Sequence, residues 1–125
     1  MEAIANVNRI SKVFAHTRED GRAAFVAYIT CGDPTLARTK QLVHEFVDAG
    51  GDIVEFGVPF SDPMADGVAN QEAANRALAN GVSLGDVLRT AGECRAAGDE
   101  IPIVLFTYYN PVFAYGLEKF AVDAE

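Results

Sequence analysis

A carboxylate interrupts an apolar stretch of the chain. Glu55 lies in the segment DIVEFG (52–57), between Val54 and Phe56. A carboxyl group there loses hydration, and this environment suits it to transferring a proton near neutral pH. The alternative is a Glu at the end of a strand that pairs with a Lys or Arg from another segment, because buried charges are rare unless they are paired or functional. The sequence leaves both interpretations open.

Two more carboxylates follow in the Pro-, Asp- and Gly-rich segment 58–69. Asp66 lies 11 positions after Glu55, and a loop of that length can fold back over its strand and turn Asp66 toward Glu55. Two carboxylates in different environments can divide the roles of acid and base. The alternative is turn formation, because Asp-Pro and Asp-Gly both favour turns. Turn formation is the better interpretation for Asp62, whereas both stay open for Asp66.

Aromatic side chains are expected close to these carboxylates. Tyr28, Phe106 and Tyr108 lie near the carboxyl ends of apolar runs, as Glu55 does. Alternate residues of a strand share a face, and active sites form at the carboxyl ends of parallel strands in barrels and in open sheets. An aromatic–carboxylate–aromatic set suits a flat apolar substrate with one proton to move. The alternative is that Tyr28 and Phe106 only fill the core, as single aromatic residues usually do.

The elements that must position these residues alternate in type. Apolar residues at helical spacing predict helices, and continuous apolar runs predict strands that are buried on both faces. Ser83 and Asp86 have the spacing of a capping box, and Gly50 suits a helix end. The expected order is helix 3–15, strand 24–30, helix 35–49, strand 52–57, helices 70–80 and 83–97, strand 101–108, and a helix that starts at residue 117. Such alternation implies parallel β/α units, in either a (β/α)8 barrel or a doubly wound sheet.

Composition narrows the class of protein further. The 125 residues suit one domain, and half of them are apolar. A net charge of −8 argues against nucleic acid and against a polybasic membrane surface, since both need clustered Lys and Arg. No apolar run approaches the roughly 18 residues of a membrane span. Cys31 and Cys94 lack the spacing of a metal or redox site. We expect a cytoplasmic protein with no metal.

Four segments resemble one known family, in the same order along the chain. VEFGVPFSDPMADG (54–67) resembles the signature of the tryptophan synthase α subunit, and FVAYITCGDP (25–34), RALANG (76–81) and LFTYYNPVF (105–113) match in kind. The resemblance covers about residues 20–120. It implies an α/β fold, a (β/α)8 TIM barrel of which only the first three βα units are present. Residues 1–125 would then be the N-terminal part of a single barrel domain, truncated in the third helix.

The resemblance also implies a reaction and residues for it. The family is a lyase of tryptophan biosynthesis, which cleaves indole-3-glycerol phosphate in a retro-aldol reaction to indole and glyceraldehyde 3-phosphate. The family's catalytic Glu falls on Glu55, which would protonate the indole ring. Its catalytic Asp falls on Asp66, which would hold the indole N–H and stabilise the cationic intermediate. Tyr28 and Phe106 fall on positions that line the indole pocket, and Tyr108 falls beside the site.

A protein partner is implied as well. Pro59 and Asp62 fall where the family meets its β subunit, which carries pyridoxal phosphate, and an α2β2 tetramer is expected for a full-length protein; the α chain itself has no cofactor. One alternative is a non-catalytic partial barrel that keeps only the loop contacting the β subunit. Another is a different barrel lyase or aldolase, but Lys40 and Lys119 are predicted on helices, whereas a Schiff-base aldolase needs a Lys at a strand end.

The chain also departs from the family pattern. Val68 and Ala27 stand where the family usually has Pro, and Val68 could loosen the loop that presents Asp66, because Pro limits mobile states. A complete barrel has about 250 residues and binds phosphate in its late loops. We therefore expect this chain by itself to be inactive, and no residue in it is assigned to phosphate.

Overall fold

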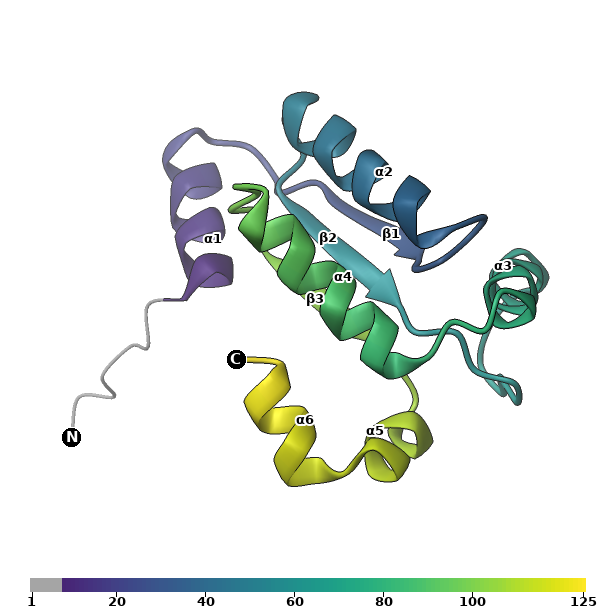
Figure 1. Ribbon diagram of the computed structural model, residues 1–125. Coiled ribbons are helices and arrows are strands. Elements are labelled where there is room, and N and C mark those ends of the chain that lie inside the picture. Colours follow the sequence, from purple (N-terminus) through teal and green to yellow (C-terminus); the bar gives the residue numbers. More distant parts are fainter. Residues whose placement is uncertain (1–7) are drawn as a thin grey trace.

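Three parallel strands form the centre of the computed structural model, which describes residues 8–125 (Figure 1). The strands are hydrogen-bonded in the order β1-β2-β3. Along the chain the elements are α1 (Arg9–Glu19), β1 (Val26–Thr30), α2 (Leu36–Asp48), β2 (Ile53–Gly57), α3 (Val68–Ala79), α4 (Leu84–Ala96), β3 (Ile103–Phe106), α5 (Tyr109–Tyr115) and α6 (Leu117–Asp123). The predicted alternation of helices with parallel strands is confirmed.

The core lies between one face of the sheet and the helices α2 and α4, which run side by side over it (Figure 1). Val54 and Phe56 alternate with Glu55 along β2 and are 1% and 0% exposed. Val43 of α2 and Val87 of α4 are fully buried against the same face. The strands therefore bury one set of alternate side chains and turn the other set to the opposite face.

Among the described residues, no helix covers that opposite face, which we call the open face. It carries Val26 and Tyr28 of β1, Glu55 and Gly57 of β2, and Phe106 of β3, which is placed by the parallel register. Val26 and Phe106 are 41% and 51% exposed. The expectation that all three apolar runs are buried on both faces is therefore wrong for this part of the chain.

Some predicted boundaries differ from the observed ones. Helix α1 runs to Glu19 rather than ending at residue 15, because Thr17 is buried and Arg18 stabilises the carboxyl end of the helix. The expected start at residue 3 lies outside the described residues. Strand β3 covers four residues instead of the predicted 101–108, because Phe106 is its last residue paired with β2.

Helix α5 differs from the prediction, which has no helix between residues 108 and 117. Pro111 is the third residue of the helix, where its missing N–H has no intrahelical partner to lose. Gly116, with φ of 102°, separates α5 from α6. The predicted helix start at Leu117 is confirmed.

The predicted helix ends agree better with the structure. Ser83 and Asp86 form a capping box at the start of α4, and Gly50 follows the end of α2 with φ of 85°. Helix α3 begins at Val68, two residues earlier than predicted, after Gly67 as its N-cap. Val68 is thus the first helical residue, a position that Pro also favours.

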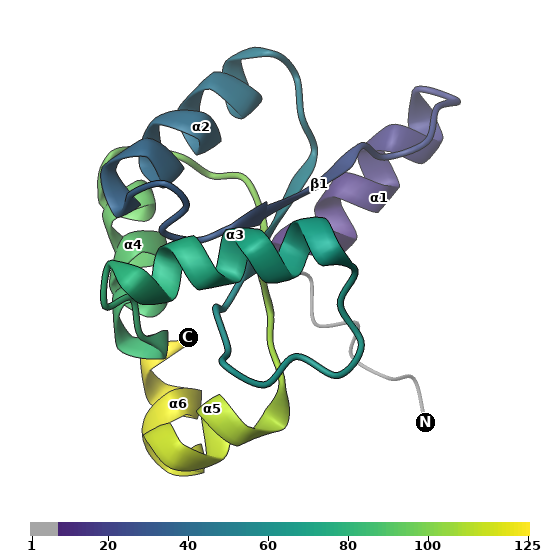
Figure 2. The same ribbon diagram turned by 90° about the vertical axis from the view of Figure 1, so that its right-hand side faces the viewer.

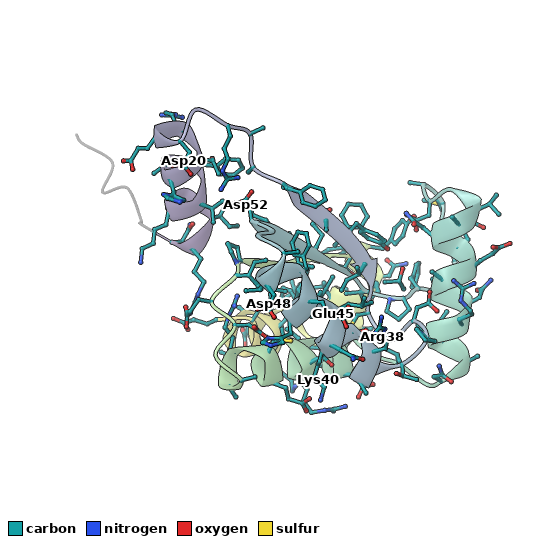
Figure 3. All side chains as sticks on the ribbon, turned by 90° about the horizontal axis from the view of Figure 1, so that it is seen from above. Asp20, Arg38, Lys40, Glu45, Asp48 and Asp52 are labelled. Atoms are coloured by element: carbon teal, nitrogen blue, oxygen red, sulfur yellow. The ribbon has the colours of Figure 1, made fainter. Side chains whose placement is uncertain are left out.

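Asp52 links the amino ends of β1 and β2 through hydrogen bonds. Its carboxylate accepts hydrogen bonds from Arg22 Nη1 and Nη2, at 2.8 and 2.9 Å, and from the Phe25 N–H, at 2.7 Å. Its side chain is only 9% exposed and lies close to the turn between α1 and β1 (Figure 3). The Arg22 guanidinium, followed by the Phe25 N–H, lowers the pKa of Asp52 to about 2.

We expect Asp52→Asn to lower the free energy of unfolding by about 1–2 kcal/mol at pH 7, since hydrogen bonds to a charged group are lost. Because the folded pKa lies below the unfolded value of about 3.9, the stabilisation is present above that value and disappears as the pH falls toward 2. Denaturant unfolding at pH 7 and pH 3 measures the difference. The exposed Asp48→Asn is the control, and an equal loss at both pH values would contradict the assignment.

Candidate active site

Glu55 lies in the centre of the open face. The parallel register places it between Tyr28 of β1 and Val104 of β3, and its side chain is half-buried. Within residues 8–125, Glu55 makes no ion pair with a Lys or Arg. The pairing that could have made it a structural residue is thus not found in the part of the chain that the structure describes.

An aromatic pair lies next to Glu55 on the same face. The rings of Tyr28 and Phe106 meet edge to face, with centroids 5.6 Å apart and an interplanar angle of 86°. They meet across Gly57, where an added Cβ would come within 2.1 Å of the Tyr28 hydroxyl oxygen. Gly57 was not singled out from the sequence, although a glycine inside a strand is a signal of such close approach. The lack of a side chain at Gly57 makes room for the Tyr28 ring beside the carboxylate.

Asp66 is held by Tyr108, from the far end of the chain. The Tyr108 hydroxyl donates to Asp66 Oδ2 at 3.1 Å and accepts from the Ala65 N–H at 2.9 Å. The loop between β2 and α3 runs beside the start of α5 (Figure 2), and the Phe60 ring lies 5.3 Å from that of Tyr108. The Gln71 amide donates to the Asp66 carbonyl at 2.7 Å. Gln71 and Phe60 were not predicted as parts of the site.

Both carboxylates act electrostatically on Tyr28. Burial raises the pKa of the Tyr28 phenol, and the negative charges of Asp66 and Glu55 raise it further. Of the two acids, Glu55 is the direct neighbour of Tyr28 in the strand register. The structure thus brings Tyr28, Glu55 and Phe106 together on the open face and Asp66 with Tyr108 at its edge.

The segment expected to contact a partner is only partly accessible. Asp62 is exposed and accepts a hydrogen bond from its neighbour Ser61 at 2.8 Å. Met64 is 92% exposed. Pro59, in contrast, is buried. A partner reaching this loop would therefore meet Asp62 and Met64 before Pro59.

Other potentially reactive groups lie away from these residues. Burial raises the pKa of the Cys31 thiol to about 12, as expected for a buried cysteine that does not react. A cavity of about 390 Å³ lies between α1, α4, β3 and α6, and neither Glu55 nor Asp66 lines it. That the loop turns Asp66 toward Glu55 stays a prediction. In residues 8–125, no cluster of three metal-ligating side chains occurs, and no helix is long and apolar enough to cross a membrane.

The fold and the site define the class of protein. It is an α/β protein built of parallel βα units, and its polar and aromatic groups lie toward the carboxyl ends of the strands. Within that class, the chain belongs to the tryptophan synthase alpha chain family, whose model matches residues 14–125.

Relatives and solved structures agree with this assignment. The tryptophan synthase alpha chain of Geobacter sp. (strain M21) is 50% identical over 118 residues, which are 94% of this chain and 44% of the relative. That of Dechloromonas aromatica is 49% identical over the same shares of both chains. The crystal structure of tryptophan synthase subunit alpha from Legionella pneumophila str. Paris has a TM-score of 0.91 and 40% identity, over 94% of this chain and 45% of that one.

The comparisons also define the fold. These structures are (β/α)8 TIM barrels, so the three parallel strands are part of such a barrel. The chain spans less than half the length of the relatives it matches. In a barrel, the face of each strand that points away from the helices points to the interior. The open face that carries Glu55 therefore corresponds to the barrel interior.

Proposed function

We propose that residues 1–125 are the N-terminal part of a single-barrel lyase that cleaves indole-3-glycerol phosphate to indole and glyceraldehyde 3-phosphate. The observation that carries this proposal is the position of Glu55 on the open face beside the Tyr28–Phe106 pair. A carboxyl group next to such an aromatic pair can protonate an aromatic ring that packs against the pair. Membership of the tryptophan synthase alpha chain family supports the same reaction.

The proposed chemistry uses two carboxylates in different roles. Glu55, as the acid, donates its proton to the indole carbon that bears the side chain, and the ring becomes cationic. Asp66 accepts the indole N–H and stabilises that positive charge. The hydroxyl on the adjacent side-chain carbon then loses its proton to the Glu55 carboxylate. The carbon–carbon bond breaks, its electron pair restores the indole ring, and the hydroxyl carbon becomes the aldehyde. Glu55 ends protonated, as it began.

Tyr108 prepares Asp66 for this role. Its hydroxyl donates to only one of the two carboxylate oxygens, Oδ2, so that the other oxygen stays available for the indole N–H. The same hydroxyl accepts from the Ala65 N–H and thereby also fixes the backbone next to the acid. Tyr28 and Phe106 would contact the faces or edges of the indole ring.

A β subunit is the proposed partner, docking on the exposed loop around Asp62 and supplying pyridoxal phosphate for its own reaction.

A second candidate function follows from the same loop. A partial barrel could keep the docking surface of Asp62 and Met64 without turning over substrate, and the exposure of both side chains favours this reading equally. Activity separates the two candidates.

The test uses a full-length chimera. Residues 1–125 are joined to the part of the Geobacter sp. (strain M21) alpha chain that follows its matched segment. We expect the chimera to release indole from indole-3-glycerol phosphate, measured by indole absorbance or fluorescence. Residues 1–125 alone are expected to release none, because barrels of this type hold phosphate with loops after strands 7 and 8. A folded chimera with no lyase activity would contradict the proposal and favour the non-catalytic candidate.

A further inference from the structure

Helix α3 begins directly after Asp66 and Gly67, so the orientation of the helix determines where Asp66 lies. Its buried residues are all alanines, Ala73, Ala74 and Ala77. Alanine side chains bury little apolar area, and they fix a helix less firmly than large interlocking side chains do. Polar contacts must therefore contribute to holding α3 in one orientation.

Such contacts occur at the opposite end of the helix. Arg76 Nε and Nη2 donate to the two carboxylate oxygens of Asp33, each at 2.8 Å. The Asn80 amide donates to the Pro34 carbonyl at 2.6 Å. The Asp33 side chain is 18% exposed, and the Arg76 guanidinium lowers its pKa. A bidentate pair of this kind restricts both distance and angle, unlike most exposed ion pairs.

The turn that carries Asp33 is itself firmly packed. The Cys31 N–H donates to the Gly57 carbonyl at 2.9 Å, and the Gly32 N–H donates to Thr39 Oγ1 at 2.9 Å. A Cβ on Gly32 would lie 2.5 Å from a methyl group of Val82. The turn is thus fixed to β2, to α2 and to the segment between α3 and α4. Asp33 is therefore held in a fixed position near the carboxyl end of β1, where it binds Arg76.

Because α3 is long, a small tilt of the helix at Arg76 causes a larger displacement at Asp66. Arg76 lies nine positions after Gly67, which is about 14 Å at 1.5 Å per helical residue. A tilt of roughly 10° about the Arg76 end would therefore move the Asp66 end by about 2 Å. Displacements of about 1 Å at a reacting centre can cost roughly 100-fold in rate.

We propose that Asp33 and Arg76 are positioning residues, which set the place of Asp66 through helix α3. The inference rests on the proposed lyase function for its kinetic consequence, but not for its structural one. Tyr108 holds Asp66 locally, while the Asp33–Arg76 pair fixes the helix from which Asp66 is presented.

The kinetic test compares Arg76→Gln, Asp33→Asn and the double variant in the full-length chimera. We expect each to lower kcat by about tenfold with little change in KM, and the double variant to be no worse than either single one. In an Asp66→Asn background, Arg76→Gln should cause no further loss. The control is Lys40→Gln, which removes a 2.6 Å ion pair between α2 and α4 (Lys40 is labelled in Figure 3). A full tenfold loss in the Asp66→Asn background would show a general structural effect and overturn the proposal.

A second measurement does not depend on activity. The Ala65 N–H is bonded to Tyr108, so its hydrogen exchange reports on the place of the loop. We expect Arg76→Gln to speed exchange of this amide by about tenfold relative to Lys40→Gln. Unchanged exchange would overturn the positioning role. If the chimera lacks lyase activity but the exchange responds, the proposed function fails and the structural coupling holds.

Discussion

Glu55→Gln in the full-length chimera is expected to lower kcat for indole release by roughly 100- to 10,000-fold. Gln keeps the size and shape of the side chain but has no proton to donate at neutral pH. Glu55 has no Lys or Arg partner among residues 8–125, so the substitution leaves no partner unpaired there. The loss should therefore appear in turnover and not in folding.

Steady-state kinetics and thermal unfolding of the same samples check this expectation. Glu45→Gln is the matched control, since Glu45 is an exposed carboxylate on α2 that pairs with Arg38 on its own helix (Figure 3). It should leave kcat unchanged. Near wild-type turnover in Glu55→Gln would mean that another group donates the proton, and the assignment of Glu55 would be wrong.

Asp66→Asn is expected to lower kcat by about 100-fold, because an amide cannot balance the positive charge that develops on the indole ring. The amide oxygen can still accept the hydrogen bond from the Tyr108 hydroxyl, which is 3.1 Å from Asp66 Oδ2. The local loop structure should therefore survive, and the effect should be smaller than that of Glu55→Gln.

The control for this change is Glu72→Gln, an exposed carboxylate on α3. It removes the same charge six residues after Asp66, and Glu72 makes no hydrogen bond to Tyr108 among those described, so its kcat should stay at the wild-type level. Equal losses in the two variants would show that net charge, and not the contact of Asp66 with indole, governs the rate.

Residues that act within one strand were the easiest to place from sequence. The apolar runs around Tyr28, Glu55 and Phe106 predicted three strands, and strand periodicity predicted which side chains share a face. The register confirms the neighbours Tyr28 and Glu55. The 11-residue spacing to Asp66 indicated a loop long enough to return toward the strand, although not the tyrosine that holds it there.

Contacts between distant segments could not be predicted in the same way. Asp33 and Arg76 are 43 residues apart, and no periodicity connects them. Gly57 matters only because the Tyr28 ring crosses it, which depends on the pairing of two strands. Helix α5 was missed because its first turn contains Asn110-Pro111. Proline breaks the interior of a helix but is tolerated in the first turn, so the sequence alone does not decide between the two.

The two acidic residues of the β2 region have separate places, Asp52 just before the strand and Glu55 at its centre. Asp52 joins the amino ends of the strands, while Glu55 lies about 10 Å further along, at 3.3 Å per residue, on the face that points to the barrel interior. Genetic screens would therefore distinguish substitutions of Asp52 from substitutions of Glu55. In the full-length chimera, a screen for the amount of folded protein would detect substitutions of Asp52 and overlook those of Glu55. If the proposed function holds, a growth test without added tryptophan would detect both.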